Sequence, residues 1–401
     1  MTPPHERTAR SDRSSRGAPG VRASARASGA PLVHRRVVLK VGTNLLTAGG
    51  DRIEGAALGG VATQVVALRD AGAQVILVSS GAIAAGRQRL DEHATSADVR
   101  SRQALAAVGQ ARLMAEWDRL FELEGVVVAQ ALLTRTDLAD RQGYLNARTT
   151  LLTLLDRGVL PVVNENDVVS VDEIEDSVLG DNDSLSAQVA NLVDADLLLI
   201  LTDIDGLYTA DPARHPEATL IERVDVIDDG VREAARGTPG RLGRGGMVTK
   251  VEAAEVATAY GADVVIADGR RADAALLAAR GEPVGTHFLP RGSRLDGRRR
   301  YLLSGLQVRG AIRVDEGAAK ALGEAGTSLL PAGVVGVEGE FARGDVVRIE
   351  TESGRRVATG IANYAAAEVG RIRGLRSHRI AEVLGHEYGE EVVHRNNLVL
   401  R

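Results

Sequence analysis

Lysine is rare in this chain, and two of its lysines stand in glycine-containing motifs. Of 49 basic residues only Lys40, Lys250 and Lys320 are lysine. GC-rich coding explains the excess of arginine, and a lysine kept under that bias is expected where a compact point charge is needed. Lys40 begins KVGTN (40–44) and Lys250 ends GRGGMVTK (243–250), where glycines let backbone N–H groups approach an anion. Both motifs are therefore candidate phosphate sites, with a solvated strand end and a flexible surface loop as the respective alternatives.

Polar residues also follow other apolar segments. VSSGAIAAG (78–86) puts two serines and a glycine before helical sequence, where backbone N–H groups favour a carboxylate or phosphate. An ordinary serine N-cap is the alternative there. NENDVV (164–169) and GDNDSLSA (180–187) gather three aspartates and three asparagines. Such a cluster can hold an ammonium group, or orient a lysine and a magnesium–nucleotide, although turns use the same residue types.

The elements that position these motifs can be predicted from the apolar pattern. Between residues 35 and 288, runs rich in Val, Ile and Leu alternate with helical sequence. Strands are expected over 35–42, 74–81, 125–133, 158–167, 196–203 and 262–269, and helices over 55–71, 82–124, 141–157, 184–194 and 246–260. This alternation indicates a mostly parallel sheet covered on both faces. Ligands of such sheets bind beyond the carboxyl ends of the strands, which is where the motifs lie.

The chain outside this region differs in composition. Residues 1–34 are rich in Arg, Ser, Ala and Pro and lack apolar periodicity, so we expect a disordered extension. A transit peptide, a natural bacterial tail and an early start codon are the three explanations left open. A basic, glycine-containing linker over 289–304 precedes short strand-like runs over 305–401, which predict a small β-rich domain. The larger α/β domain is then expected over 35–288.

Composition excludes several classes of protein. The chain has 401 residues, 44% of them hydrophobic, which is typical of a globular protein of about two or three domains. Its net charge of −5 argues against attachment to nucleic acid or membrane through bulk charge. Cysteine is absent, so disulfides, thiolate metal sites and cysteine nucleophiles are excluded. No apolar stretch approaches the roughly 18 residues of a membrane-spanning helix.

Taken together, the motifs point to a known family. The order KVGTN, SSGAIAAG, NEND, GDNDSLSA, LTDIDGLYTADP, GGMVTK resembles the glutamate 5-kinases of the amino-acid kinase superfamily. The tail, with GAAKAL, SLLPAGV, VEGEF and EVVHRNNLVL, resembles a PUA domain. The resemblance covers about residues 35–400. It implies the amino-acid kinase fold, a three-layer αβα sandwich with a mostly parallel central sheet, and a small C-terminal β-rich PUA-like domain.

The resemblance also implies an activity. The γ-phosphoryl group of ATP would pass to the side-chain carboxylate of L-glutamate, giving L-glutamate 5-phosphate in the first step of proline biosynthesis. Mg²⁺ would arrive with ATP and have no direct protein ligand. L-proline would inhibit by feedback. We further expect a cytoplasmic homo-oligomer that channels its product to glutamate-5-semialdehyde dehydrogenase.

Roles for individual residues follow from matching the motifs. Lys40 and Lys250 would stabilise the transferring phosphoryl group, and Asp183 would orient them. Ser80, Asp167 and Asn182 would bind glutamate. The ATP-binding residues would be Lys40, Thr202, Asp203, Arg244, Gly245, Gly246, Met247, Val248, Thr249 and Lys250. Arg244 departs from the family pattern, in which a small residue such as threonine is expected, and would add a guanidinium beside the phosphates.

Two other functions compete with this interpretation. Acetylglutamate, aspartate and uridylate kinases share the scaffold, but the NEND and GDND motifs together with the β-rich tail favour glutamate. The PUA-like tail raises the alternative of an RNA-binding or RNA-modifying protein. Residues 305–401 carry 13 basic and 13 acidic side chains. That zero balance and the lack of an aromatic stacking stripe argue against RNA.

Overall fold

The structure of the chain is a computed structural model that describes residues 30–91, 98–170, 182–237, 246–291 and 308–400. The predicted N-terminal extension and the predicted linker fall almost entirely outside the described residues. Asp181, Arg244 and Gly245 lie outside them as well. No helix of the described residues is long and apolar enough to cross a membrane.

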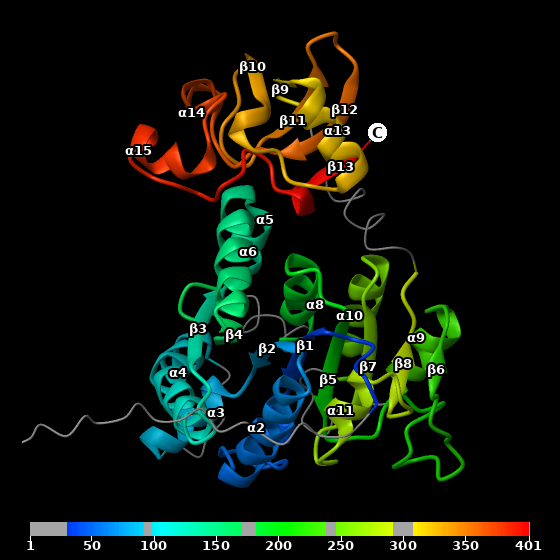
Figure 1. The fold of residues 1–401 in the computed structure, drawn as a ribbon. Coiled ribbons are helices and arrows are strands. Elements are labelled where there is room, and N and C mark those ends of the chain that lie inside the picture. The colour runs from blue at the N-terminus through cyan, green and yellow to red at the C-terminus, as the bar shows by residue number, and fades with distance from the viewer. Residues whose placement is uncertain (1–29, 92–97, 171–181, 238–245, 292–307, 401) are drawn as a thin grey trace, which may run out of the picture.

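A central eight-stranded sheet organises the larger part of the chain (Figure 1). Its strand order is β3-β4-β2-β1-β5-β7-β8-β6. The strands are β1 (Arg36–Val41), β2 (Gln74–Ser79), β3 (Val128–Leu133), β4 (Leu160–Glu165), β5 (Leu197–Thr202), β6 (Arg223–Val224), β7 (Asp263–Asp268) and β8 (Thr286–Phe288). All neighbours are parallel except β7 and β8. The predicted mostly parallel sheet is therefore confirmed, and the short strands β6 and β8 were not predicted.

Helices cover both faces of this sheet. They are α1 (Thr43–Leu46), α2 (Gly55–Asp70), α3 (Ala82–Leu90), α4 (Val99–Glu122), α5 (Arg135–Ala139), α6 (Arg141–Asp156), α8 (Asp183–Leu192), α9 (Asp229–Arg236), α10 (Met247–Ala259) and α11 (Ala274–Ala279). Successive residues of a strand point to opposite faces. Accordingly, Val38 packs in one core with α5, α6, α8, α9 and α10, while Val37 and Leu39 pack in another with α1 to α4 and α11. The fold is the predicted three-layer αβα sandwich.

The predicted helix over 82–124 is two helices, α3 and α4, which cross at glycines. A Cβ atom at Gly86 would lie 2.0 Å from the carbonyl oxygen of Leu105, and one at Gly109 would lie 1.8 Å from that of Ala82. Only glycine allows backbones to approach so closely. This contact holds α4 against the start of α3, directly after β2.

The C-terminal part forms a second sheet with its own core. The strand order is β10-β9-β11-β12-β13, with β9 and β11 parallel and the other pairs antiparallel. The elements are β9 (Gly310–Val314), α13 (Glu316–Ala325), η1 (Pro331–Gly333), β10 (Val334–Gly339), β11 (Val346–Thr351), β12 (Arg356–Ile361), α14 (Ala366–Ile372), η2 (Ser377–Arg379), α15 (Ile380–Leu384), η3 (Arg395–Asn397) and β13 (Leu398–Leu400). Its buried cluster contains Ile312, Val347 and Tyr364. The β-rich C-terminal domain is thus confirmed, while the exact domain boundaries stay predictions.

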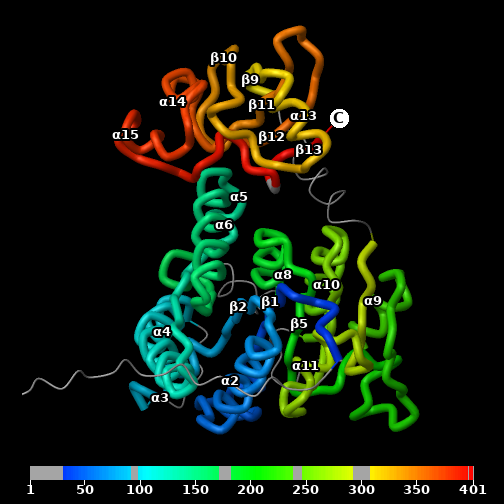
Figure 2. Tube along the Cα trace, in the orientation of Figure 1, coloured from blue at the N-terminus to red at the C-terminus, as the bar shows by residue number. Residues whose placement is uncertain are grey.

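Helix α6 of the larger domain packs against the C-terminal domain. It projects from the first sheet to the C-terminal domain (Figures 1 and 2). Leu145 of α6 forms a small apolar cluster with Val346 and Ile361. Beside it, the Arg141 guanidinium lies 3.2 Å from the Asp345 carboxylate. The contact is small and mixed in chemistry, as expected between domains of one chain.

Candidate active site

Four strand ends bring the predicted motifs to one edge of the sheet. β1 lies between β2 and β5 in parallel register, so that Lys40 is opposite Val78 on one side and Ile200 on the other. β4 is parallel to β2. Because parallel strands end at the same edge, the residues after each strand can share a site. Helices α8 and α10 begin with Asp183 and Met247, and their first turns bring Asp183 and Lys250 to Lys40.

Lys40, Asp183 and Lys250 form a buried ion triad. The Lys40 Nζ atom lies 2.7 Å from Asp183 Oδ1, and both side chains are fully buried. Lys250 Nζ lies 3.1 Å from Asp183 Oδ2. The Thr249 hydroxyl donates to the same Oδ2 at 2.8 Å. A single carboxylate therefore holds two ammonium groups next to each other, and Lys40 is not the solvated strand end that the sequence left open.

The triad keeps Asp183 ionised. Burial of the carboxyl opposes ionisation, but the charges of Lys250 and Lys40 and the hydrogen bonds from Lys40 and Thr249 outweigh it. Together they lower the pKa of Asp183 from 3.8 to about 2. Two positive charges and one negative charge then leave a net positive site, which favours an anion such as a phosphate.

The glutamate-binding residues predicted from the motifs lie around a second cluster. The Asn182 amide donates to the Ser79 carbonyl at 3.0 Å, to the Ser80 hydroxyl at 3.3 Å and to Asn164 Oδ1 at 2.6 Å. Gly81, with φ of +104°, is the N-cap of α3 and no side chain caps the helix. The alternative of a serine N-cap is therefore wrong, and the Ser80 hydroxyl faces Asn182 instead.

Asp167 lies just beyond the end of β4 and is buried. Nearby, Glu165 is buried too and accepts a hydrogen bond from the Ser170 hydroxyl at 2.6 Å. Val168 and Val169, in contrast, are exposed. In the loop after β4 the acidic side chain of Asp167 is therefore buried while the two valines are exposed, the reverse of an ordinary surface turn.

Apart from Lys40, the predicted nucleotide residues that the structure describes lie at the carboxyl end of β5 and at the start of α10. Thr202 is buried at the end of β5, and its hydroxyl donates to Asp203 at 3.2 Å. Gly246 is the extended N-cap of α10, without a side-chain cap. Arg270, after β7, donates to the Asp203 carbonyl at 2.9 Å and pairs with Asp268 at 2.8 Å. Arg270 is a cation that sequence reasoning missed.

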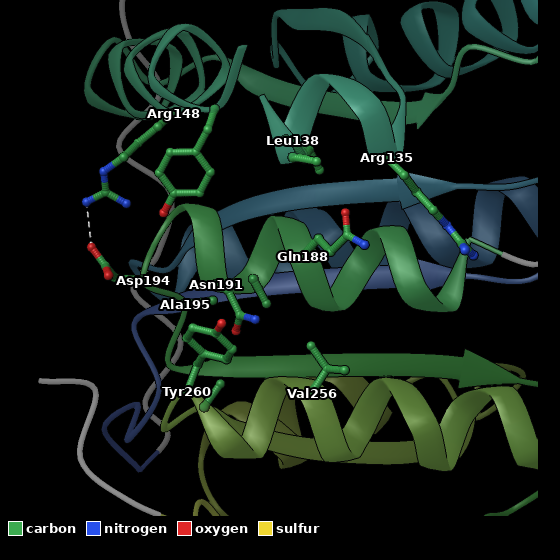
Figure 3. Close-up of a pocket in the computed structure, with 13 residues that line it drawn as sticks. Arg135, Leu138, Arg148, Gln188, Asn191, Asp194, Ala195, Val256 and Tyr260 are labelled. Carbon is green, nitrogen blue, oxygen red and sulfur yellow. Dashed lines mark hydrogen bonds and ion pairs between the residues drawn. The ribbon is translucent and has the colours of Figure 1, made fainter. Parts of the chain in front are cut away.

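A separate cavity of about 350 Å³ lies between α5, α6, α8 and α10 (Figure 3). Its lining includes Tyr144, Tyr260 and the pair formed by Arg148 and Asp194, whose atoms are 2.6 Å apart. None of the predicted site residues lines it. The chemistry is therefore assigned to the strand ends, where the buried charges are.

Two family models match the chain. The model of the amino acid kinase family matches residues 35–268, and that of the PUA domain matches residues 310–384. The chain belongs to the amino acid kinase family. Both resemblances inferred from the motifs are thereby confirmed.

Curated relatives of this amino acid kinase are named glutamate 5-kinase. Those of Dehalococcoides mccartyi (strain CBDB1) and Herpetosiphon aurantiacus are each 50% identical over 367 residues, 92% of this chain and 98% of each relative. The one of Paraburkholderia phymatum is 48% identical over 366 residues, 91% of this chain and 98% of the relative. The similarity thus spans both domains.

A kinase of this family uses ATP together with a divalent metal. Within the described ranges, no group of three His, Cys, Asp or Glu is arranged to hold a metal ion. Both oxygens of Asp183 already contact lysines. This donor set fits a metal that is carried largely by nucleotide phosphates and water.

Several residues of this amino acid kinase site were not singled out by sequence reasoning. Asn164 was counted in the polar cluster of the NENDVV motif but was given no role of its own, and Glu165 belongs to the same motif, which was a signal that could have found both roles. Gln110, which accepts from Asn164 at 2.7 Å, and Trp117, which donates to the Ser79 hydroxyl at 3.1 Å, lie on α4. Their helix carries no motif, and only the fold shows that it reaches the site. Trp117 is fully buried.

Proposed function

We propose that this kinase transfers the γ-phosphoryl group of ATP to the side-chain carboxylate of L-glutamate. The observation that carries the proposal is the buried triad of Lys40, Asp183 and Lys250. The names of the relatives supply the substrate. On this proposal the product is L-glutamate 5-phosphate, and the reaction opens proline biosynthesis.

The residues suit a reaction that needs charge neutralisation and no base. A carboxylate is already ionised at neutral pH and can attack the phosphoryl group directly. Catalysis then rests on positioning the two substrates and on stabilising negative charge in the transition state. Lys40 and Lys250 supply that charge from fixed positions, because Asp183 holds both ammonium groups before substrate arrives. Asp183 is in this role a positioning residue.

The nucleotide is proposed to bind along the start of α10. Backbone N–H groups after Gly246 have no side-chain cap, which suits the phosphates of ATP. Met247, Val248, Thr249 and Lys250 follow directly, and Thr202 with Asp203 flank the nucleotide from β5. Mg²⁺ would arrive with ATP and would supply charge neutralisation at its phosphates. Arg244 and Gly245 keep their predicted roles as ATP ligands.

Glutamate is proposed to bind between the ends of β2 and β4. Ser80 and Asn182 contact each other there, and Asp167 lies on the loop after β4. A buried carboxylate favours the α-ammonium group of an amino acid. The side-chain carboxylate would then point to the lysines of the triad, where the phosphoryl group arrives.

An ATP-dependent hydroxamate assay tests this function. Hydroxylamine converts an acyl phosphate into a hydroxamate, so colour is expected with L-glutamate and ATP and not without either. N-acetyl-L-glutamate and L-aspartate are the matched acceptors of rival kinases, and ADP release with UMP covers the third rival. Faster turnover of any of these than of L-glutamate would contradict the proposal.

L-proline is proposed as a competing ligand. It shares the α-carboxylate and a positively charged nitrogen with glutamate and lacks the reacting carboxylate. We expect Asp167→Asn to weaken both, by roughly 10- to 150-fold, because one charge-assisted hydrogen bond contributes about 1.5–3 kcal/mol. The measurements are the glutamate KM and the proline inhibition constant. Loss of glutamate binding with unchanged proline inhibition would place proline elsewhere.

Assembly and location are also proposed from the family. We expect a cytoplasmic homo-oligomer, with the acyl phosphate passed to glutamate-5-semialdehyde dehydrogenase. An acyl phosphate hydrolyses readily, so a direct transfer would protect it. Light scattering of the purified protein tests the oligomer, and co-sedimentation with the dehydrogenase tests the transfer complex.

A further inference from the structure

A chain of side-chain amides runs from helix α4 to the proposed glutamate site. Asn164 donates through Nδ2 to Gln110 Oε1 at 2.7 Å. Asn182 donates in turn through Nδ2 to Asn164 Oδ1 at 2.6 Å. We propose that Gln110 is a positioning residue that fixes the orientation of this amide chain and thereby the selectivity for an amino acid. The inference rests on the proposed function, since it concerns the glutamate site.

Asn164 can face its neighbours in only one orientation. Its Oδ1 atom accepts from Asn182 Nδ2 and from the backbone N–H of Glu165 at 2.9 Å. A reversed amide would set its NH₂ group against these two donors. The correct orientation leaves Nδ2 pointing to α4, and Asn164 is buried, so that group needs an acceptor. Gln110 Oε1 is the acceptor that the structure provides.

The orientation of Asn164 is passed on to Asn182. The Nδ2 group of Asn182 faces three acceptors, which are Asn164 Oδ1, the Ser80 hydroxyl and the Ser79 carbonyl. Its Oδ1 atom is therefore on the opposite arm of the amide. Among the described residues this buried oxygen has no hydrogen-bond partner. It offers an acceptor to a ligand, and the α-ammonium group is the part of glutamate that can donate to it.

Gln110 is suited to a role in orientation rather than in packing. It is only half-buried, whereas α4 is anchored in the core by Leu113, Trp117 and Phe121. Trp117, seven residues further along the same face of α4, donates to the Ser79 hydroxyl. The helix thus contacts the ends of both β2 and β4, through Trp117 and Gln110 respectively. Changing Gln110 alone removes an acceptor from the amide chain and leaves the apolar contacts of α4 in place.

The test compares Gln110→Met, in which methionine has a similar shape and only a weakly accepting sulfur, with Gln110→Glu, in which glutamate keeps an oxygen acceptor. In Gln110→Met we expect the glutamate KM to rise about 5- to 100-fold, because a buried N–H group is left unpaired. The ATP KM and kcat should change by less than about threefold, since the triad is untouched. The preference for L-glutamate over glutarate, which lacks the amine, should fall as well. Gln110→Glu should restore both the KM and the preference.

A matched control is Gln74→Met at the other edge of the sheet. Gln74 Oε1 also accepts one side-chain hydrogen bond, from Arg36 Nε at 2.9 Å. Its loss should leave the glutamate KM unchanged. An unchanged KM in Gln110→Met, or an increase that Gln110→Glu shares, would overturn the role of Gln110. A wild-type protein that does not phosphorylate glutamate would instead refute the proposed function itself.

Discussion

Charge is buried beneath the strand ends of the eight-stranded sheet, while in the C-terminal domain charged pairs lie at the surface. Asp183 and two lysines are enclosed in the first region. In the second, Arg313 and Glu338 approach to 2.8 Å with side chains 51% and 57% exposed. Burying an ion costs several kcal/mol of solvation, whereas an exposed pair contributes about 0–1 kcal/mol. The contrast indicates that the buried charges of the triad serve the reaction rather than stability. The C-terminal domain is stabilised mainly by its apolar core.

The largest expected effect is on stability when the carboxylate of the triad is removed. Asp183→Asn leaves two ammonium groups buried next to each other, and we expect a loss of about 3–5 kcal/mol in the free energy of unfolding. Glu338→Gln, which removes an exposed carboxylate, should cost less than about 1 kcal/mol. Urea unfolding of both variants measures the difference. Equal losses would show that the two regions do not differ in this respect.

The pH dependence of unfolding tests the contribution of ionised Asp183 to stability. Because the pKa of Asp183 is lowered from 3.8 to about 2 in the fold, its contribution to stability is fully present above about pH 4. It is lost as the pH falls from about 4 through about 2, and amounts to about 2 kcal/mol. Asp183→Asn should lose this part of the acid dependence. A wild-type and variant with parallel stability curves below pH 4 would contradict the assignment.

The three lysines give the next comparison. We expect Lys40→Ala and Lys250→Ala each to lower kcat by at least ~100-fold, which is typical for a fixed charge at a transition state. Lys40→Arg and Lys250→Arg should fail too, since a planar fork does not fit a buried point-charge site. Lys320 of α13 is 72% exposed and 3.9 Å from Glu324, so Lys320→Arg is the control and should be neutral. Near-normal turnover in Lys40→Arg or Lys250→Arg would contradict the requirement for lysine at these two positions.

Separating the regions should have a moderate effect. A fragment of residues 1–290 contains every described residue of the site, and we expect it to fold and to retain glutamate-dependent ATP turnover. Its free energy of unfolding should be lower by about 1.5–3 kcal/mol, because Leu145 of α6 becomes exposed when its contacts with Val346 and Ile361 are removed. Leu145→Lys should improve the solubility of the fragment and destabilise the full chain. An inactive fragment would make the C-terminal domain part of the catalytic unit.

The smallest effect is expected at the N-terminus. A variant that begins at Leu32 keeps the contact of Leu32 with the core and the bonds of Val33 and His34 N–H to the Ala279 carbonyl, both at 3.0 Å. Its melting temperature and activity should equal those of the full chain. A variant that begins at Arg36 loses these contacts and should melt lower. A loss of several degrees in the first variant would show that residues 1–31 dock on the fold.

Much of the fold could be predicted because its determinants are local. Buried parallel strands appear in sequence as short runs of Val, Ile and Leu, and helices as longer amphipathic segments. The predicted strands over 35–42 and 196–203 agree with β1 and β5 to within about one residue at each end. The short β6 and β8 were missed because two or three residues carry no period. The helical sequence predicted over 82–124 forms two helices, α3 and α4, and the pattern did not separate them because both are helical in pattern.

The candidate site was predictable in part. Lys40, Asp183 and Lys250 stand in motifs of unusual composition next to strand or helix ends, so their types and positions could be predicted from the sequence. Their catalytic roles stay predictions until the variants are measured. The sequence did not show that one carboxylate holds both lysines, since these residues are far apart in the chain. That arrangement depends on how α8 and α10 begin beside β1.

The sequence by itself determined the order of the main strands and helices of the larger domain, the lysine and glycine motifs, and the family to which they belong. Only the tertiary structure decided which side chains support the site from a distance. Gln110 and Trp117 reach the strand ends because Gly86 and Gly109 let α3 and α4 cross closely. The position of α4 depends on packing between helices, which no local pattern records. Hydrogen bonds that cross such a contact therefore become visible only once the chain is folded.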